Sequence, residues 1–162
     1  MNRFAFSART IDDTERLGVA LAELLPDGTT IALCGTLGAG KTRLVQAIAA
    51  ATGVNREEVV SPTFVLCHEY HGRRAIYHLD AYRLKDDDEF LQLGPEEYFE
   101  SAGLTIVEWA DRVAACLPID RLEINITVTG DTSREFEIIA RGQRLEPVVM
   151  ALAQRLGGTP VE

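Results

Sequence analysis

The sequence predicts an α/β fold with a mixed sheet flanked by helices. Short apolar runs alternate with segments of helical spacing along the chain. The pattern G-x-x-x-x-G-K-[ST], which cradles phosphates between a strand and a helix, occupies residues 35–42. A length of 162 residues is typical of one domain. Together these observations predict a single P-loop NTPase domain over residues 1–162, with a frayed tail at 156–162.

The segment before the phosphate loop predicts a strand and then a helix. Phe4 and Phe6 indicate a short first strand. Asp12 followed three residues later by Glu15 fits a capping box, with Asp12 as the N-cap. Pro26 then ends the helix. Its apolar stripe comprises Leu17, Ala20, Leu21 and Leu24.

The phosphate loop has the flanking elements that its pattern requires. Residues 29–34 are apolar and β-compatible, and Leu44, Val45 and Ile48 recur at helical spacing after the loop. Gly53 stands where that helix should end. Phosphates would therefore lie at a helix N-terminus, where free N–H groups and the helix dipole favour anions.

The remaining chain predicts further strands and short helices. Residues 54–63 form a loop, and two strands joined by a hairpin-like turn follow at 64–70 and 75–80. The other expected strands cover residues 104–108, 122–129 and 136–140. The expected helices cover residues 86–94, 95–102, 110–117 and 146–156.

The phosphate loop implies a nucleotide with Mg²⁺ as ligands. Lys41 can reach the β- and γ-phosphates, and the Thr42 hydroxyl can bind Mg²⁺. The [NT]-K-x-D pattern of guanine recognition is missing, because Lys41 lies in the phosphate loop and Lys85 follows Leu84. ATP is therefore the expected cofactor. The phosphate-loop contacts are expected from Gly35, Gly38, Ala39, Gly40, Lys41, Thr42 and Arg43.

Two acids end apolar strand-like runs and are candidates to complete a catalytic site with Lys41. Asp80 follows residues 76–79, and Glu108 follows residues 104–107. Ligands in open α/β sheets bind beyond the carboxyl ends of strands, so both acids can face the phosphates. One can hold Mg²⁺ while the other orients the attacking water, and the sequence leaves the two roles open.

Composition argues against several classes of protein. The net charge is −9 and only two residues are lysine, which disfavours direct, salt-driven nucleic-acid binding. Arg73, Arg74 and Arg83 can make local contacts or stay solvated. The chain shows neither a signal peptide nor a membrane-spanning apolar run, so we expect a cytoplasmic protein that does not bind membranes. Three scattered cysteines fit reduced thiols.

The histidines give a weak metal signal. His68, His71 and His78 lie near Cys67 but lack the paired spacing of zinc ligands. His78 is expected to pack or to form hydrogen bonds within its strand.

At this point the chain resembles the bacterial TsaE (YjeE) family, the ATPase of tRNA threonylcarbamoyladenosine biosynthesis. Four sequence blocks carry the resemblance: residues 35–42, Ser61-Pro62-Thr63-Phe64 with Glu69-Tyr70, residues 78–84, and Val107-Glu108-Trp109.

The resemblance implies a small P-loop fold that binds ATP with Mg²⁺. Thr42 and Asp80 would match the Mg²⁺-linked positions, and Glu108 an acidic position near the metal and the γ-phosphate. Thr63 would belong to a switch loop, and Trp109 would be the aromatic residue beside the site. The family acts with TsaD and TsaB on adenosine 37 of tRNA, so this chain is expected to meet tRNA only through that protein complex.

Two positions depart from the family pattern, and the segments expected to contact the base carry no motif. Thr36 and Arg43 stand where the family often has Asp and Thr. Residues 10–14 and 130–133 correspond to segments that enclose the base, with Ile11 and Thr132 as contact candidates. A small-molecule kinase and a nucleotide-dependent adaptor without catalytic turnover remain as alternative functions.

Overall fold

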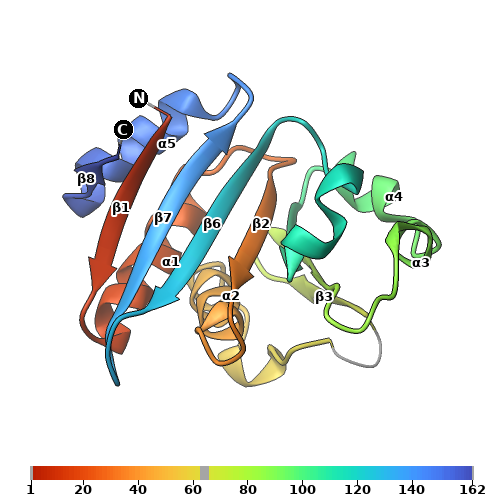
Figure 1. The fold of residues 1–162 in the computed structure, drawn as a ribbon, viewed down its shortest axis with the longest axis horizontal. Helices are drawn as coiled ribbons and strands as arrows, with labels where there is room; N and C mark the ends of the chain where they lie inside the picture. Colours follow the sequence, from red (N-terminus) through yellow and green to blue (C-terminus); the bar gives the residue numbers. More distant parts are fainter. Residues whose placement is uncertain (1, 63–65, 162) are drawn as a thin grey trace.

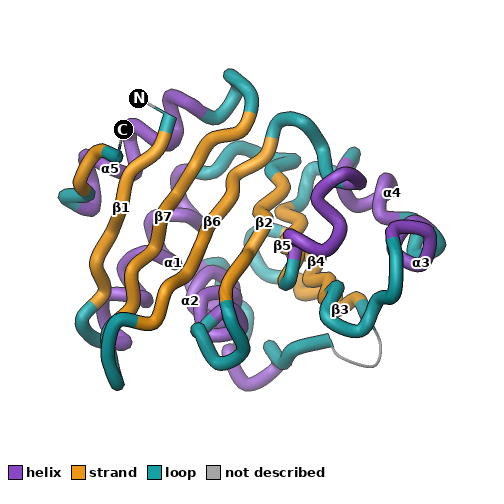
Figure 2. Tube along the Cα trace, viewed as in Figure 1, coloured by secondary structure: helices purple, strands orange, loops and turns teal. Residues whose placement is uncertain are grey.

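The computed structural model describes residues 2–62 and 66–161. Within these residues, eight strands form one mixed sheet in the order β3-β4-β5-β2-β6-β7-β1-β8 (Figures 1 and 2). The predicted α/β fold, a mixed sheet flanked by helices, is therefore confirmed.

The elements follow the predicted order, with boundaries that shift by a few residues. The strands are β1 (Arg3–Ala8), β2 (Thr30–Gly35), β3 (Cys67–His71), β4 (Ala75–Asp80), β5 (Leu104–Glu108), β6 (Arg121–Val128), β7 (Arg134–Arg141) and β8 (Thr159–Pro160). The helices are α1 (Ile11–Leu24), α2 (Lys41–Ala51), α3 (Asp87–Leu91), α4 (Pro95–Phe99) and α5 (Glu146–Leu156), with 3-10 turns η1 (Arg56–Glu58) and η2 (Ala110–Cys116).

The parallel part of the sheet lies at its centre. Strand β2 pairs in parallel with β5 on one side and β6 on the other, and β5 pairs in parallel with β4. The carboxyl ends of β2, β4 and β5 therefore meet at one edge, where ligands of open α/β sheets bind. The remaining strands add to both sides in antiparallel pairs.

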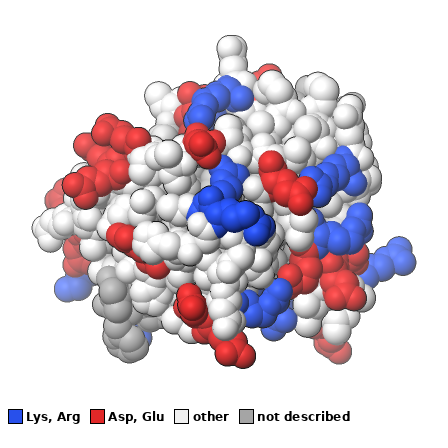
Figure 3. Space-filling view, turned by 180° about the vertical axis from the view of Figure 1, so that it is seen from behind, with Lys and Arg blue, Asp and Glu red and all other residues white. Residues whose placement is uncertain are grey.

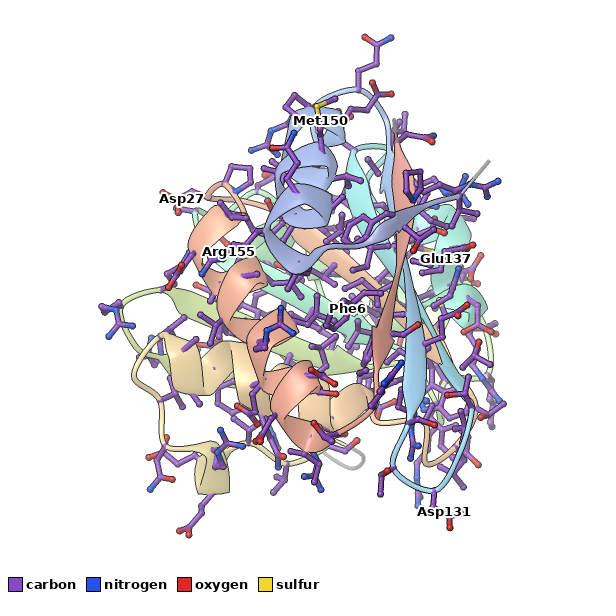
Figure 4. All side chains as sticks on the ribbon, turned by 90° about the vertical axis from the view of Figure 1, so that its left-hand side faces the viewer. Phe6, Asp27, Asp131, Glu137, Met150 and Arg155 are labelled. Atoms are coloured by element: carbon purple, nitrogen blue, oxygen red, sulfur yellow. The ribbon has the colours of Figure 1, made fainter. Side chains whose placement is uncertain are left out.

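Helices cover the two faces of the sheet unequally. Helices α1, α2 and α5 pack on one face, and Figure 4 shows Phe6 pointing from β1 into this layer. On the other face, a smaller apolar cluster joins Leu79 and Val107 to Phe90 of α3 and Val113 of η2. The β1–β7–β6 side of that second face carries polar residues such as Glu137, which points away from the helices in Figure 4.

Helices α1 and α2 approach closely at Gly18. A Cβ added to Gly18 would lie 2.8 Å from the Ala47 carbonyl carbon and 3.0 Å from the Ile48 nitrogen, closer than ordinary van der Waals contact. Glycine permits this approach, and α1 thereby braces the helix that follows the phosphate loop.

The β3–β4 turn is tied to the ends of two helices. The Arg73 side chain donates to the Ala51 carbonyl, and its backbone N–H donates to Thr52 at 2.7 Å. Arg74 donates to the Ala22 carbonyl at 2.8 Å and to Asp27 at 3.3 Å. These arginines satisfy carbonyls at helix C-termini, so they have a structural role instead of being freely solvated.

The prediction about the start of α1 was wrong. Thr10, not Asp12, is the N-cap of α1, and its partner in the capping box is Asp13. The Asp13 carboxylate accepts from the backbone N–H groups of Arg9 and Thr10, and these bonds lower its pKa. In the expected frayed tail, Thr159 and Pro160 instead pair with β1 as strand β8.

The charged side chains are mixed over the helical face. In Figure 3, basic side chains on this face are separated by acidic and uncharged ones. Among the described residues, no helix is long and apolar enough to cross a membrane.

Candidate nucleotide-binding site

The phosphate loop connects β2 to α2 through left-handed glycines. Gly38 and Gly40 have φ angles of +78° and +107°, which side chains with a Cβ rarely adopt. These two positions let the chain turn tightly between the strand and the helix. The unpaired N–H groups of the first turn of α2 then stand at the loop, as anion binding requires.

Lys41 is the first residue of α2 and folds back over the loop. Its ammonium donates to the carbonyls of Gly35 at 2.8 Å and Thr36 at 2.9 Å, and lies 3.9 Å from the centre of the Trp109 ring. Burial lowers the pKa of Lys41, while the nearby Glu108 and Asp80 carboxylates act in the opposite direction. The cation is thus held beside the loop, in a cavity where a phosphate group can serve as its counter-ion.

Sheet register places the two predicted acids side by side. Asp80 pairs with Glu108 at the ends of the adjacent parallel strands β4 and β5, and only 4% and 2% of their surfaces are exposed. Glu108 accepts the Thr42 hydroxyl at 3.1 and 3.2 Å. Asp80 accepts the Ser61 hydroxyl at 2.6 Å and the Tyr82 backbone N–H at 2.8 Å.

These groups line one cavity of about 420 Å³. Its lining comprises residues 37–43 with Ser61, Asp80, Tyr82, Glu108 and Trp109. Nine of the sequence-predicted site residues therefore share this cavity: Gly38, Ala39, Gly40, Lys41, Thr42, Arg43, Asp80, Glu108 and Trp109. Gly35 lies outside its lining but contributes a carbonyl that Lys41 binds.

The oxygen groups in this cavity fit Mg²⁺. A hydroxyl and one or two carboxylates are the protein ligands that Mg²⁺ takes in phosphate sites, where phosphates and waters complete the coordination. The described residues contain no group of three His, Cys, Asp or Glu side chains arranged around a metal position. This donor set would suit a metal whose remaining ligands come from phosphates and water.

Trp109 forms one wall of the cavity in an unusual conformation. Its φ angle is +57°, and its ring lies 4.8 Å from the ring of Tyr82. Arg112 extends this stack, with its guanidinium 5.3 Å from the Tyr82 ring. The sequence identified Trp109 but not Tyr82, whose only signal was its position two residues after Asp80.

A second cavity of about 260 Å³ lies on the other side of the phosphate loop. It brings together Ile11 and Thr132, the two candidates for base contact, with Arg43 and residues 38–40. The Thr132 hydroxyl donates to the carbonyl of Arg9, the residue just before the segment 10–14, at 3.1 Å. Arg134, which the sequence did not single out, lines the same cavity and donates to the Ala39 carbonyl at 2.9 Å.

Two other expectations concern this region. Thr63 lies outside the described residues. His78 was expected to pack or to bond within its own strand, but it bonds to the neighbouring strands: its Nε2 lies 2.5 Å from Glu108 and its Nδ1 lies 3.0 Å from the Tyr70 hydroxyl. The sequence could have indicated this contact, because His78 lies two residues before Asp80 and therefore on the same face of β4.

A third cavity, of about 720 Å³, opens on the opposite face of the sheet between β2, β6 and η2. It shares Trp109 with the nucleotide cavity and is lined by Cys34. Burial is the main cause that raises the pKa of the Cys34 thiol to about 11, and Asp111 adds to the effect.

Comparisons with known proteins show that this chain is similar to members of one family. The family model of the threonylcarbamoyl adenosine biosynthesis protein TsaE matches residues 8–136. A tRNA threonylcarbamoyladenosine biosynthesis protein TsaE from Treponema pallidum is 39% identical over 131 residues, which cover 81% of this chain and 96% of the relative. The one from Bacillus subtilis is 38% identical over 149 residues, covering 90% and 92%. The crystal structure of Bacillus subtilis YdiB superposes with a TM-score of 0.78 at 31% identity, covering 94% of this chain and 95% of that one.

Proposed function

Because this chain belongs to the TsaE family, which functions in tRNA threonylcarbamoyladenosine biosynthesis, we propose that it serves that modification as a Mg²⁺-dependent ATPase. The resemblance noted in the sequence is confirmed by the family match and by relatives that cover most of the chain. The nucleotide, the metal and the hydrolytic step are the proposal.

One observation carries the proposal. The phosphate-loop Lys41 and Thr42 share a single cavity with two buried carboxylates that come from different strands. A cation for phosphates, a hydroxyl for the metal and acids for the metal and the water are the parts that ATP hydrolysis on a P-loop requires.

In this proposal, different groups of the protein bind the phosphates and the metal. Backbone N–H groups of the loop and the Lys41 ammonium bind the phosphates, with phosphate oxygens replacing the Gly35 and Thr36 carbonyls as acceptors. Thr42 and Asp80 would hold Mg²⁺, which neutralises the charge that develops on the phosphate oxygens. Glu108 accepts a hydrogen bond from the Thr42 hydroxyl, which leaves an oxygen lone pair of that hydroxyl free for the metal.

Glu108 has a second task in this proposal. It is oriented by the Thr42 hydroxyl on one side and by His78 on the other. A fixed carboxylate at the metal can orient the attacking water and accept its proton. Slow turnover by the isolated chain is expected, since such switch proteins often receive part of their transition-state stabilisation from a partner.

The partners proposed are TsaD and TsaB, in the cytoplasm. The net charge of −9 and the mixed surface charges favour docking to proteins over direct binding to tRNA. Arg73 and Arg74, two of the arginines that might have contacted RNA, are engaged with helix ends. Contact with tRNA at position 37 would therefore be indirect, through the TsaD–TsaB pair.

The test is ATP hydrolysis by the purified chain with Mg²⁺, alone and with TsaD, TsaB and tRNA. We expect stimulation by the pair, and we expect Lys41→Ala to abolish hydrolysis in both conditions. An unchanged, partner-stimulated rate in Lys41→Ala would refute the assignment of the site. Tight ATP binding without hydrolysis, even with both partners, would instead favour the adaptor function.

A further inference from the structure

A buried chain of hydrogen bonds runs behind the candidate site. The Tyr70 hydroxyl lies 3.0 Å from Nδ1 of His78, and Nε2 of His78 lies 2.5 Å from Oε2 of Glu108. Glu108 in turn accepts the Thr42 hydroxyl. The side chains come from β3, β4, β5 and α2, and His78 is fully buried. This series of hydrogen bonds thus crosses three strands and reaches the helix that follows the phosphate loop.

The donor and acceptor groups of these side chains determine which way each hydrogen bond points. An ionised carboxylate only accepts, so Nε2 of His78 donates to Glu108 when that carboxyl is ionised. A neutral imidazole that donates from Nε2 accepts at Nδ1, and the Tyr70 hydroxyl is placed to donate there. Burial raises the pKa of Tyr70 to about 12, which keeps this proton on the hydroxyl.

The same tyrosine reaches the loop that precedes β3. The Tyr70 hydroxyl has one proton, and the Val60 carbonyl, at 3.3 Å, is a longer and weaker acceptor for it than Nδ1 of His78 at 3.0 Å. The next residue, Ser61, donates to Asp80 at 2.6 Å. The beginning of this loop is therefore bonded directly to Asp80, and it lies beside the Tyr70 hydroxyl that contacts His78.

We propose that Tyr70 and His78 are positioning residues of the nucleotide site, which fix the tautomer of the imidazole and hold Glu108 against the Thr42 hydroxyl. This inference rests on the proposed ATPase function. Removing the Tyr70 hydroxyl leaves Nδ1 of a buried histidine without its donor, and the ring can then turn or move its proton to the other nitrogen. Glu108 loses its fixed donor and is no longer oriented toward Thr42.

The test compares Tyr70→Phe with Tyr77→Phe. Each variant removes one phenolic hydroxyl from the same hairpin, but Tyr77 faces the opposite side of the sheet, where its ring packs 4.9 Å from that of Tyr98. Loss of a hydrogen-bonding partner that orients the groups around a metal site typically costs about 10- to 100-fold in activity. We expect Tyr70→Phe to lower kcat for ATP hydrolysis by about that factor while KM changes by less than about twofold.

A second readout is independent of turnover. Nitrogen-15 NMR of the histidine rings in the protein without nucleotide reports which ring nitrogen carries the proton. We expect His78 in the wild type and in Tyr77→Phe to be protonated at Nε2, and expect this signature to be lost in Tyr70→Phe. The His78 signals are assigned by their absence in His78→Gln.

The outcomes separate this inference from the proposed function. A wild-type rate in Tyr70→Phe, or a His78 protonated only at Nδ1 in the wild type, would overturn the positioning role. A wild-type protein that binds but does not hydrolyse ATP would refute the ATPase proposal alone, because the NMR signature would still decide whether Tyr70 fixes His78.

Discussion

Substitution of Gly18 by alanine should loosen the support of the phosphate-loop helix. The new Cβ would lie closest to the Ala47 Cβ, and it would lie 2.8 Å from the Ala47 carbonyl carbon and 3.0 Å from the Ile48 nitrogen. None of these three atoms can rotate away. Since unstrained contacts between carbon atoms lie near 3.5–4.0 Å, α1 and α2 must separate by roughly 0.5–1 Å.

The size of the effect follows from two opposing contributions. Overpacking costs about 1–3 kcal/mol, and the upper end applies here because the Ala47 Cβ and two backbone atoms all lie in the way. Alanine recovers about 1 kcal/mol of helix propensity relative to glycine. We therefore expect a net loss of about 2 kcal/mol in the free energy of unfolding, measured by urea denaturation, and a fall in Tm of about 4–8 °C.

A double-mutant cycle tests the reasoning. Ala47→Gly removes the side chain closest to the new Cβ, so Gly18→Ala should cost less in that background, with a coupling energy of about 1 kcal/mol or more. A Gly18→Ala variant as stable as the wild type would refute the close approach. Equal costs in both backgrounds would show that Ala47 is not the obstacle.

Two further outcomes are expected. Asp80→Ala should weaken Mg²⁺-dependent ATP turnover more than it weakens folding, because the carboxylate is a proposed metal ligand; turnover equal to that of the wild type at saturating Mg²⁺ would contradict this role. Cys34, whose pKa is raised from 9.0 to about 11, is protonated at pH 8 and should react with iodoacetamide about 100-fold more slowly than an ordinary thiol. Its rate, followed by peptide mass spectrometry, should rise about tenfold per pH unit towards pH 11, and a rate that levels off near pH 9 would show an unperturbed thiol.

The sequence was sufficient where the signal is local. The phosphate-loop pattern contains its own glycines, lysine and threonine, and the flanking strand and helix follow from periodicity. Asp80 and Glu108 were identified because each ends an apolar run, and parallel pairing of β4 and β5 then places them side by side. The positions of the two strand ends were enough to infer that Asp80 and Glu108 lie together.

The sequence was insufficient where a residue's role depends on a distant element. Arg73 and Arg74 have the local sequence of a solvated turn, and their role exists only because α1 and α2 end beside that turn. Asp12 and Asp13 lie next to one another in an acidic run, and only the backbone conformation at Thr10 decides which carboxylate completes the cap. In both cases the contact is made by backbone groups, which leave no trace in the side-chain pattern.

The hydrogen bonds from Tyr70 through His78 to Glu108 show how strongly the site depends on the register of the sheet. His78 lies opposite Ile106 on β5 and His68 on β3, so it reaches Glu108 and Tyr70 along diagonals of the sheet. Because side chains alternate between faces, a slip of β4 by one residue would turn both His78 and Asp80 away from α2. The burial of Ile76 and Leu79 on opposite faces of β4 makes such a slip costly. Apolar packing of this strand therefore fixes the register that sets its polar residues against Thr42, and the geometry of the nucleotide site is determined within the sheet as much as in the phosphate loop.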